Sequence, residues 1–199
     1  LASFRAHWNR DLEADLLRRF GLNPDQKASD LSRGQKTQLA LVSAICPEPE
    51  LLLLDEPTSG LDPIVRREFI ETIIGAYQSG DPGRRTVFVS THLIAEFEGL
   101  IDEFTIVEQG RELLTMEADA ARDRFKKIRA RFAGTPPQLG LVGALNVRQS
   151  GREVEVLANG NSEQLLAALR AHNPEDLRCE SLALEEIFVA SRTLVQNRL

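Results

Sequence analysis

Two adjacent carboxylates, Asp55 and Glu56, offer the clearest chemistry in this sequence. They follow four leucines, Leu51 to Leu54, and precede the turn-forming Pro57. Successive side chains of a strand point to opposite faces, so the two acids can hold separate roles, one near a metal ion and the other near a water molecule. A solvated strand end with two ordinary acids is the plainer interpretation, and the pair taken alone favours it.

The elements that must position these acids are two strands of a parallel sheet. A short apolar run bounded by breakers is typical of a strand covered on both faces, although a buried helical turn gives the same pattern. Residues 86–90 form a second such run, which ends in Ser90, Thr91 and His92. A helix predicted over 62–80 separates the runs, so the strands should pair in parallel and bring His92 to the same edge as the acids. A histidine at that edge is as much a structural candidate as a catalytic one.

A further group of polar residues marks the start of a helix. Ser32 and Gln35 are spaced as a capping box, which predicts a helix that begins at Arg33 and ends before Pro47. A helix start with a hydroxyl and Gly34 offers N–H groups and the positive end of the helix dipole, which suit a phosphate. A well-capped core helix is the simpler interpretation of the same residues.

Length and composition indicate a globular chain with one main core and a small appendage. The 199 residues are 42% hydrophobic and 27% charged, with a formal net charge of −6. Residues 122–199 hold 12 Lys and Arg against 9 Asp and Glu, which leaves 12 against 21 for residues 1–121. This balance gives no support to nucleic-acid binding. The basic cluster from Arg122 to Arg131 is the local exception, and a solvated face is favoured there over a phosphate or lipid-headgroup contact.

The two cysteines, Cys46 and Cys179, have no partners at metal-binding spacing. We expect both to be buried, reduced thiols of a cytoplasmic protein. No apolar run approaches the ~20 residues that span a bilayer, so any membrane connection is expected to run through a partner. Because the sequence starts at Leu1 within a helical pattern, we expect its natural beginning to lie upstream.

The patterns predict an α/β domain over residues 1–121 and a small α+β domain over 122–199. The first also holds helices at 8–20 and 93–100, and a hairpin over 103–116 is expected to close it. No catalytic constellation is evident in the second, so a regulatory or packing role is expected. Its predicted strands are 126–132, 144–149, 152–158 and 176–182, and its predicted helices are 162–172 and 184–194.

Three segments, in this order, resemble the nucleotide-binding subunit of ABC transporters: Leu31–Gln35, Leu51–Asp62 and Ser90–His92. They look like its signature motif, its Walker B strand with the D-loop, and its switch histidine, and the ordered set is specific where each motif alone is weak. The resemblance covers residues 1–116. It implies a P-loop NTPase-like parallel sheet core lacking its amino-terminal part, with a helical subdomain remnant. The later segment Leu184–Phe188 is similar to the carboxyl-terminal extension of ABC-2-type exporter ATPases.

The resemblance implies a role for each matching residue. Asp55 would orient Mg²⁺ through its water shell, Glu56 would polarise the water that attacks the γ-phosphate of ATP, and His92 would contact that phosphate. Signature residues would reach the nucleotide of the opposite subunit, and D-loop residues would lie at the subunit interface. The signature residues are Ser32, Arg33, Gly34 and Gln35, and the D-loop residues are Ser59, Gly60, Leu61 and Asp62.

The resemblance also implies partners and a location. ATP would lie between two copies of the subunit in a head-to-tail dimer, and its hydrolysis would drive transmembrane permease subunits, with export the expected direction. The protein would be peripheral, on the cytoplasmic face of the inner or plasma membrane. Nucleic acid is not an expected partner.

Two features depart from the family pattern. Arg33 stands where many members have glycine, although ABC-2-type members often carry a basic residue there. No Gly-x-x-x-x-Gly-Lys-Ser/Thr occurs among the 199 residues, so the phosphate cradle and its lysine are absent from them. We therefore expect a fragment that does not bind ATP in the usual way and that exposes an unpaired, apolar sheet edge.

Two other functions compete with a transporter ATPase. One is a soluble ABC-type ATPase acting on ribosomes or DNA, which tandem cassettes or a long coiled-coil insertion would favour, and neither is visible. The other is a non-enzymatic, truncated ABC domain. Nucleotide binding separates this second alternative from the two ATPases.

Overall fold

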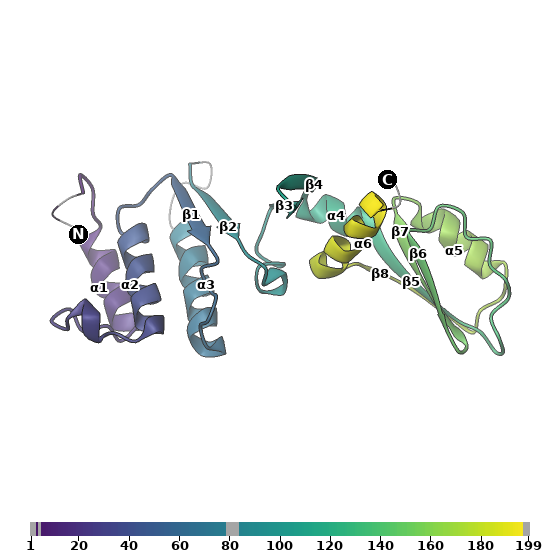
Figure 1. The fold of residues 1–199 in the computed structure, drawn as a ribbon, viewed down its shortest axis with the longest axis horizontal. Helices are drawn as coiled ribbons and strands as arrows, with labels where there is room; N and C mark the ends of the chain where they lie inside the picture. Colours follow the sequence, from purple (N-terminus) through teal and green to yellow (C-terminus); the bar gives the residue numbers. More distant parts are fainter. Residues whose placement is uncertain (1–2, 4, 79–83, 197–199) are drawn as a thin grey trace. The chain divides into compact units, whose positions relative to one another are not determined.

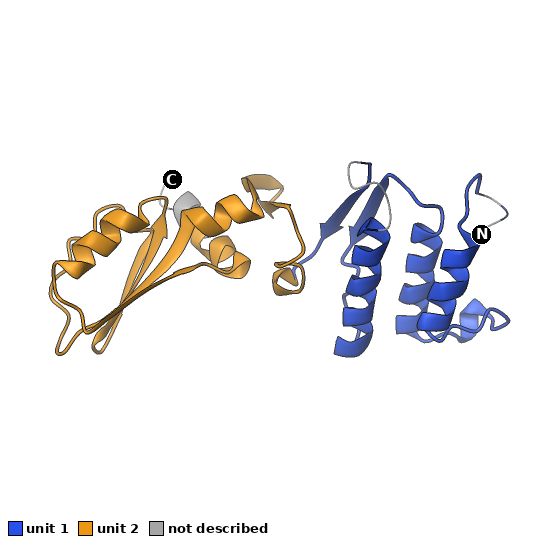
Figure 2. Cartoon of the chain, turned by 180° about the vertical axis from the view of Figure 1, so that it is seen from behind, with its two compact units in different colours: residues 1–92 blue, residues 93–199 orange. Residues whose placement is uncertain are grey.

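The computed structural model describes residues 3, 5–78 and 84–196, which fall into two compact units, residues 1–92 and 93–199 (Figures 1 and 2). Each unit has a hydrophobic core of its own. None of the helices formed by the described residues is both long and apolar enough to cross a membrane.

The described residues of unit 1 (residues 1–92) form three α-helices and a two-stranded sheet (Figure 1). The predicted helices and strands of this part are all present, while Gly80 and the turn expected at 81–83 lie outside the described residues. Leu16, Val42 and Phe69, one from each helix, are buried in the common core. The elements are α1 (Arg10–Arg19), η2 (Ala28–Asp30), α2 (Arg33–Ile45), β1 (Leu51–Asp55), α3 (Pro63–Gln78) and β2 (Thr86–Ser90).

Side-chain caps fix the starts of these helices. The predicted capping box of α2 is confirmed: Gln35 N–H donates to Ser32 Oγ at 3.2 Å, and Ser32 N–H donates to Gln35 Oε1 at 3.0 Å. Asp62 Oδ1 accepts from two N–H groups in the first turn of α3, each at 3.1 Å. Asn9 caps α1 in the same way, at 2.9 Å. Each cap stabilises its helix by about 1 kcal/mol.

The sheet of unit 1 is parallel, as predicted, but only one of its faces is covered. Leu51 pairs with Thr86 and the register continues to the pair Asp55 and Ser90. Leu52, 9% exposed, packs into the core, whereas Leu53 and Phe88 are 67% and 59% exposed. The expectation of two strands buried on both faces is wrong for the described residues, because α2 and α3 pack on one side of the sheet alone. The predicted apolar surface is present.

Unit 2 (residues 93–199) is built around a four-stranded antiparallel sheet in the order β6-β7-β5-β8. Helix α5 packs its buried leucines against Ile128, Val154 and Val156. The strands and helices predicted for residues 126–194 are confirmed, and every end lies within two residues of its predicted position. The elements are η3 (Ile94–Glu96), β3 (Glu103–Glu108), β4 (Arg111–Glu117), α4 (Ala118–Arg124), β5 (Phe125–Arg131), β6 (Asn146–Ser150), β7 (Glu153–Asn159), α5 (Ser162–Arg170), β8 (Asp176–Ser181) and α6 (Leu184–Gln196).

Two predictions about the start of unit 2 differ from the structure. The β3–β4 hairpin packs with the second unit, because Ile106 and Leu114 join the core formed by Phe125 and Ile187. The compact units therefore divide after His92 rather than after residue 121. The helix expected at 93–100 is only the short turn η3, since so few residues do not sustain a helix unless tertiary contacts support it.

The cysteine prediction holds for one residue of two. Cys46 is fully buried, and burial, together with the carboxylates of Glu13 and Glu48, raises the pKa of its thiol to about 11. Cys179 is exposed, contrary to expectation, because it lies on the edge strand β8.

Candidate active site

The carboxyl ends of β1 and β2 meet at one edge of the unit 1 sheet (Figure 1). Asp55 is level with Ser90, and Glu56 N–H continues the pairing by donating to Ser90 O at 2.8 Å. His92 lies two residues beyond the end of β2. The juxtaposition of Asp55, Glu56 and His92 expected from the sequence is therefore confirmed.

Glu56 and His92 are in direct contact. Glu56 Oε1 lies 2.8 Å from His92 Nδ1 and also accepts the His92 backbone N–H at 3.0 Å. A carboxylate oxygen accepts, so His92 Nδ1 donates in this contact and Nε2 is left for another partner. Both side chains are accessible, with His92 68% and Glu56 39% exposed, so the pair adds little to stability. Its geometry instead orients the imidazole.

The backbone and the second oxygen of Glu56 are unusual. Its φ of 45° lies in the left-handed region, which costs a non-glycine residue on the order of 1 kcal/mol. Glu56 Oε2 is buried and has no hydrogen-bond partner among the described residues. A strained residue with a buried, unsatisfied carboxylate oxygen is a candidate for chemistry, because such a group in a folded protein calls for a functional explanation.

Asp55 is held by a residue to which the sequence assigned no role. Ser90 Oγ donates a hydrogen bond to Asp55 Oδ1. The signal that points to Ser90 is the parallel register, which pairs position 55 with position 90. This bond orients the Asp55 carboxylate and leaves its second oxygen for another ligand.

The donors near Asp55 can hold only part of a metal ion's coordination shell. The described residues contain no group of three or more His, Cys, Asp and Glu side chains that could hold a metal. Mg²⁺, however, commonly takes one or two carboxylates and completes its shell with water and substrate phosphates. Asp55 with Ser90 fits that manner of binding and does not fit a closed metal site.

The start of α2 packs against the predicted D-loop turn within the same unit. Gly60 has a φ of 72°, and a Cβ added there would lie 3.1 Å from Cζ of Arg33, so the guanidinium lies directly against this glycine. A Cβ added at Gly34 would touch Leu61 at 3.9 Å. The two segments predicted to act between subunits are thus neighbours in one chain.

The predicted D-loop residues divide into exposed and buried ones. Ser59, Gly60 and Asp62 are exposed, whereas the Leu61 side chain is 5% exposed and belongs to the core. The Leu61 side chain therefore packs within its own unit and is not free to meet a partner. Asp62 already has a structural role as the cap of α3.

An open groove of about 550 Å³ connects these features. Arg33 and Thr37 of α2 line it together with Asp55, Glu56 and Ser59. Its remaining wall is apolar, formed by residues such as Leu53 and Phe69 of the sheet and α3. The groove thus joins a cationic helix start to two carboxylates across an apolar floor.

Comparisons with known proteins match this region. A family model described as "AAA domain, putative AbiEii toxin, Type IV TA system" matches residues 14–97. The Nod factor export ATP-binding protein I of Rhizobium leguminosarum bv. viciae is 30% identical over 171 residues, which are 82% of this chain and 52% of that protein. The ABC transporter ATP-binding protein YtrB of Bacillus subtilis (strain 168) is 26% identical over 178 residues, which are 88% of this chain and 60% of that protein.

A solved structure, "Structure of ATP binding subunit of ABC transporter", is 28% identical with a TM-score of 0.49, covering 57% of this chain and 48% of that one. This chain spans about half the length of the curated relatives that match most of its own sequence. The two curated relatives match more residues than either unit contains, and each is described as an ATP-binding protein. By sequence, this chain belongs to the family of ABC transporter ATP-binding proteins.

Proposed function

We propose that the complete subunit binds and hydrolyses ATP and so powers an ABC membrane transporter. The observation that carries this proposal is the contact between Glu56 Oε1 and His92 Nδ1 at the sheet edge that also holds Asp55. Phosphoryl transfer needs a group that positions the attacking water and a group that handles charge on the phosphate. The pair supplies both from neighbouring strands.

Glu56 is proposed to act as the base that polarises the attacking water. Its Oε1 is occupied by His92, while Oε2 has no partner among the described residues. A water that reaches the Glu56 carboxylate would be the one activated. His92, held through Nδ1, would present Nε2 towards the γ-phosphate and hold the water in line with the phosphate.

Asp55 is proposed to bind Mg²⁺ through water. When bound, Mg²⁺ neutralises charge on the β- and γ-phosphates. Ser90 holds the Asp55 carboxylate in one orientation, so the free oxygen faces a fixed direction. The hydrogen bond from Ser90 gives this chain a way to set that orientation before nucleotide arrives.

The remaining site residues are proposed to act between two copies of the subunit. Ser32 and Gln35 are accessible at the start of α2, where helix N–H groups favour an anion. Arg33 adds a positive charge beside them and against Gly60. Support for a role in trans comes from their resemblance to the signature motif, and Ser59 to Asp62 would complete the subunit interface.

The proposed partners are transmembrane permease subunits and a second ATPase subunit. A relative described as a Nod factor export ATP-binding protein supports export as the direction. The proposed location is the cytoplasmic face of the membrane, where permease subunits would hold the protein. For the 199 residues alone we retain the prediction of no ATP binding in the usual way, because they contain no glycine-rich phosphate loop.

The test is ATP turnover by the complete subunit with Glu56→Gln. Loss of the base should lower kcat by about 10² to 10⁴ and should accumulate an ATP-bound dimer, seen by size-exclusion chromatography. His92→Ala should also lower turnover while leaving the folding transition unchanged. Glu50→Gln is the matched control and should keep full activity. Glu50 lies just before the start of β1 and is 75% exposed. Unchanged turnover in Glu56→Gln would rule out the general-base assignment.

A second candidate is a soluble ABC-type ATPase. The match of residues 14–97 to the AAA domain family is compatible with it. The two candidates differ in what limits turnover. Stimulation of ATP hydrolysis by permease subunits in a bilayer supports the transporter, and full activity without them supports the soluble enzyme.

A further inference from the structure

Strand β8 lies at an open edge of the unit 2 sheet. It is the last strand in the order β6-β7-β5-β8 and pairs with β5 on one side. Five of its six residues are exposed, and Leu177 is half-buried. The edge of a sheet is a template for a further strand, so a protein either blocks such an edge or uses it for binding.

Alternate residues of β8 direct their backbone groups away from β5. Leu182 N–H, one residue beyond the strand, donates to Phe125 O at 3.0 Å. The hydrogen-bonded residues of an antiparallel pair alternate, so Glu180 and Arg178 bond to β5 in the same way. The residues between them face outward: Leu177, Cys179 and Ser181. An added strand can bond to the N–H and C=O groups of these three residues.

The alternation limits how a second copy of β8 can pair with the first. In a twofold pair, residue i of one copy lies opposite residue j of the other, and j lies opposite i. The outward groups belong to every second residue, so both members of each bonded pair must come from that set. The twofold axis must therefore pass through a residue of the strand, and it cannot pass between two residues.

The charges of β8 favour one of these axes. About Cys179, Arg178 of each copy lies opposite Glu180 of the other, which gives two pairs of opposite charge. About Arg178 or Glu180, like charges would lie directly opposite each other, which is destabilising. About Leu177, Asp176 would face Arg178, but only half of the strand would find a partner in β8, against nearly all of it about Cys179.

The two charged side chains can reach a second copy without losing the contacts that they already have. Arg178 is 77% exposed, and its Nε lies 2.8 Å from Asp176 Oδ2. A guanidinium carries five N–H donors, so several remain for another carboxylate. Glu180 is 52% exposed, and its Oε1 lies 3.2 Å from Arg129 Nη1. The second oxygen of Glu180 is therefore left for a further cation.

The other edge strand, β6, is not complementary to itself. Its charged residue is Arg148, and β6 contains no acid. A second copy of β6 would therefore gain no pair of opposite charges. Pairing of β6 with β8 of another molecule would leave one edge of each kind free and would extend into an open chain, whereas β8 paired with itself closes as a dimer.

We propose that β8 is an interface between two copies of this chain, which pair antiparallel about Cys179 and join their four-stranded sheets into one. The edge takes a second copy because the strand is complementary to itself in charge and in its outward backbone groups. The inference rests on unit 2 alone and needs no ATP, so it is independent of the function proposed above. Few residues of each copy take part, so the dimer should be weak.

The test is sedimentation equilibrium of the 199-residue chain in reducing buffer without nucleotide. The wild type should dimerise with a Kd below about 1 mM. Arg178→Glu places like charges opposite each other twice in the dimer and should raise that Kd about tenfold or more. Arg178→Glu combined with Glu180→Arg restores the opposite charges and should restore dimerisation.

Cys179→Pro tests the backbone pairing and also serves if the double variant does not fold. The Cys179 N–H points away from β5, so proline there removes a donor to the second copy and no bond within the sheet. The variant should keep the circular dichroism spectrum of the wild type and should be monomeric. Arg148→Glu, which reverses a charge on the other edge strand, is the matched control and should leave the Kd unchanged.

Cross-linking locates the contact. A short bismaleimide should join Cys179 of one copy to Cys179 of the other, because residues opposite each other in a hydrogen-bonded pair have Cα atoms about 5.5 Å apart. Cys46 should not react, since it is fully buried and the pKa of its thiol is raised to about 11. A dimer that Arg178→Glu and Cys179→Pro leave unchanged would overturn the proposal, because the contact would then lie elsewhere. A wild-type chain that stays monomeric up to the stated concentration would overturn it as well.

Discussion

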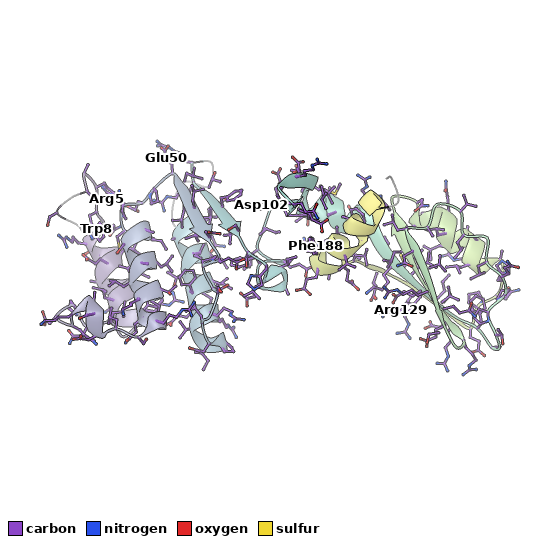
Figure 3. All side chains as sticks on the ribbon, viewed as in Figure 1. Arg5, Trp8, Glu50, Asp102, Arg129 and Phe188 are labelled. Atoms are coloured by element: carbon purple, nitrogen blue, oxygen red, sulfur yellow. The ribbon has the colours of Figure 1, made fainter. Side chains whose placement is uncertain are left out.

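The parallel sheet of unit 1 and the four-stranded sheet of unit 2 have open faces of opposite character. On the sheet of unit 1, Leu51, Leu53 and Phe88 are exposed, and the polar groups gather at one end. On the sheet of unit 2, charged side chains cover the open face. Arg129, marked in Figure 3, pairs with Glu155 on β7 and Glu180 on β8, each at 3.2 Å.

The two sheets differ in whether their charged side chains have partners. In unit 2 Arg129 has an acid on each neighbouring strand, so cross-strand pairing explains why these residues stand where they do. In unit 1, Glu56 combines a left-handed backbone with an oxygen that has no partner among the described residues. Locally inconsistent residues of this kind are expected at functional sites, and locally consistent ones within a scaffold.

The largest effect that tests this comparison comes from matched truncations in the two sheets. Ile128→Ala in β5 removes a fully buried side chain and should lower the free energy of unfolding by about 3 kcal/mol. Leu53→Ala in β1 should cost less than about 1 kcal/mol, because that side chain is already 67% exposed. Urea unfolding followed by circular dichroism measures both.

The control for this pair is Leu52→Ala, one position along the same strand as Leu53. Leu52 is 9% exposed, so its truncation should cost more than that of Leu53. Trp8, the single tryptophan, reports on unit 1 by fluorescence. Equal costs for Leu52 and Leu53 would mean that the open face of β1 is covered in solution.

Much of this arrangement could be predicted from local sequence. The parallel pairing of β1 with β2 followed from apolar runs separated by a helix of crossover length, and it placed Asp55, Glu56 and His92 at one edge. The capping box at Ser32 fixed the start of α2 to the residue. These features depend on neighbouring residues, whose spacing the sequence displays directly.

The features that were missed depend on distant contacts. The hairpin joined unit 2 because of its packing on Phe125 and Ile187, which no local pattern reveals. Four leucines in a row indicate burial on both faces but do not say which residues cover them. The bond from Ser90 to Asp55 and the contact of Glu98 with Leu184 span 35 and 86 residues, beyond the reach of motif spacing.

An intermediate effect is expected for Lys127, a basic side chain of unit 2 that is buried. Lys127 is 8% exposed, and its ammonium pairs with Glu186 and lies 3.8 Å from Glu180. Lys127→Met keeps the stem but leaves Glu186 without its cation, while Glu180 keeps Arg129. The substitution should cost about 2 kcal/mol, below the range for fully buried pairs because Glu186 is 40% exposed. Urea unfolding by circular dichroism measures it.

Arg129→Met is the matched control for Lys127→Met. Arg129 is 53% exposed on the same strand and makes pairs of the same kind, so its loss should change stability far less. A cost as large as that of Lys127→Met would show that the solvated pairs, and not only the buried one, hold this sheet together.

The smallest effect concerns Glu48, a carboxylate of unit 1 that has hydrogen-bond partners, as Glu155 on the unit 2 sheet does. The hydrogen bond between Glu48 and His7 Nε2, at 2.6 Å, lowers the pKa of Glu48, and Arg85 lowers it further, against burial that acts to raise it. A carboxyl with a lowered pKa in the folded state holds its proton less tightly there than in the unfolded chain, where the value is 4.5. The stabilisation is therefore complete above about pH 4.5 and is lost as the pH falls through the folded value.

Glu48→Gln should accordingly flatten the acid limb of unit 1 stability, measured by Trp8 fluorescence in urea between pH 3 and 6 (roughly the window set by the unfolded carboxyl). Glu50→Gln, which removes a 75% exposed carboxylate two residues away, is the control for loss of charge. If Glu48→Gln followed the wild-type curve, the cluster of His7, Glu48 and Arg85 would contribute nothing to the acid limb. These paired charges of unit 1 would then add no measurable stability, unlike the buried pair of Lys127 with Glu186 in unit 2.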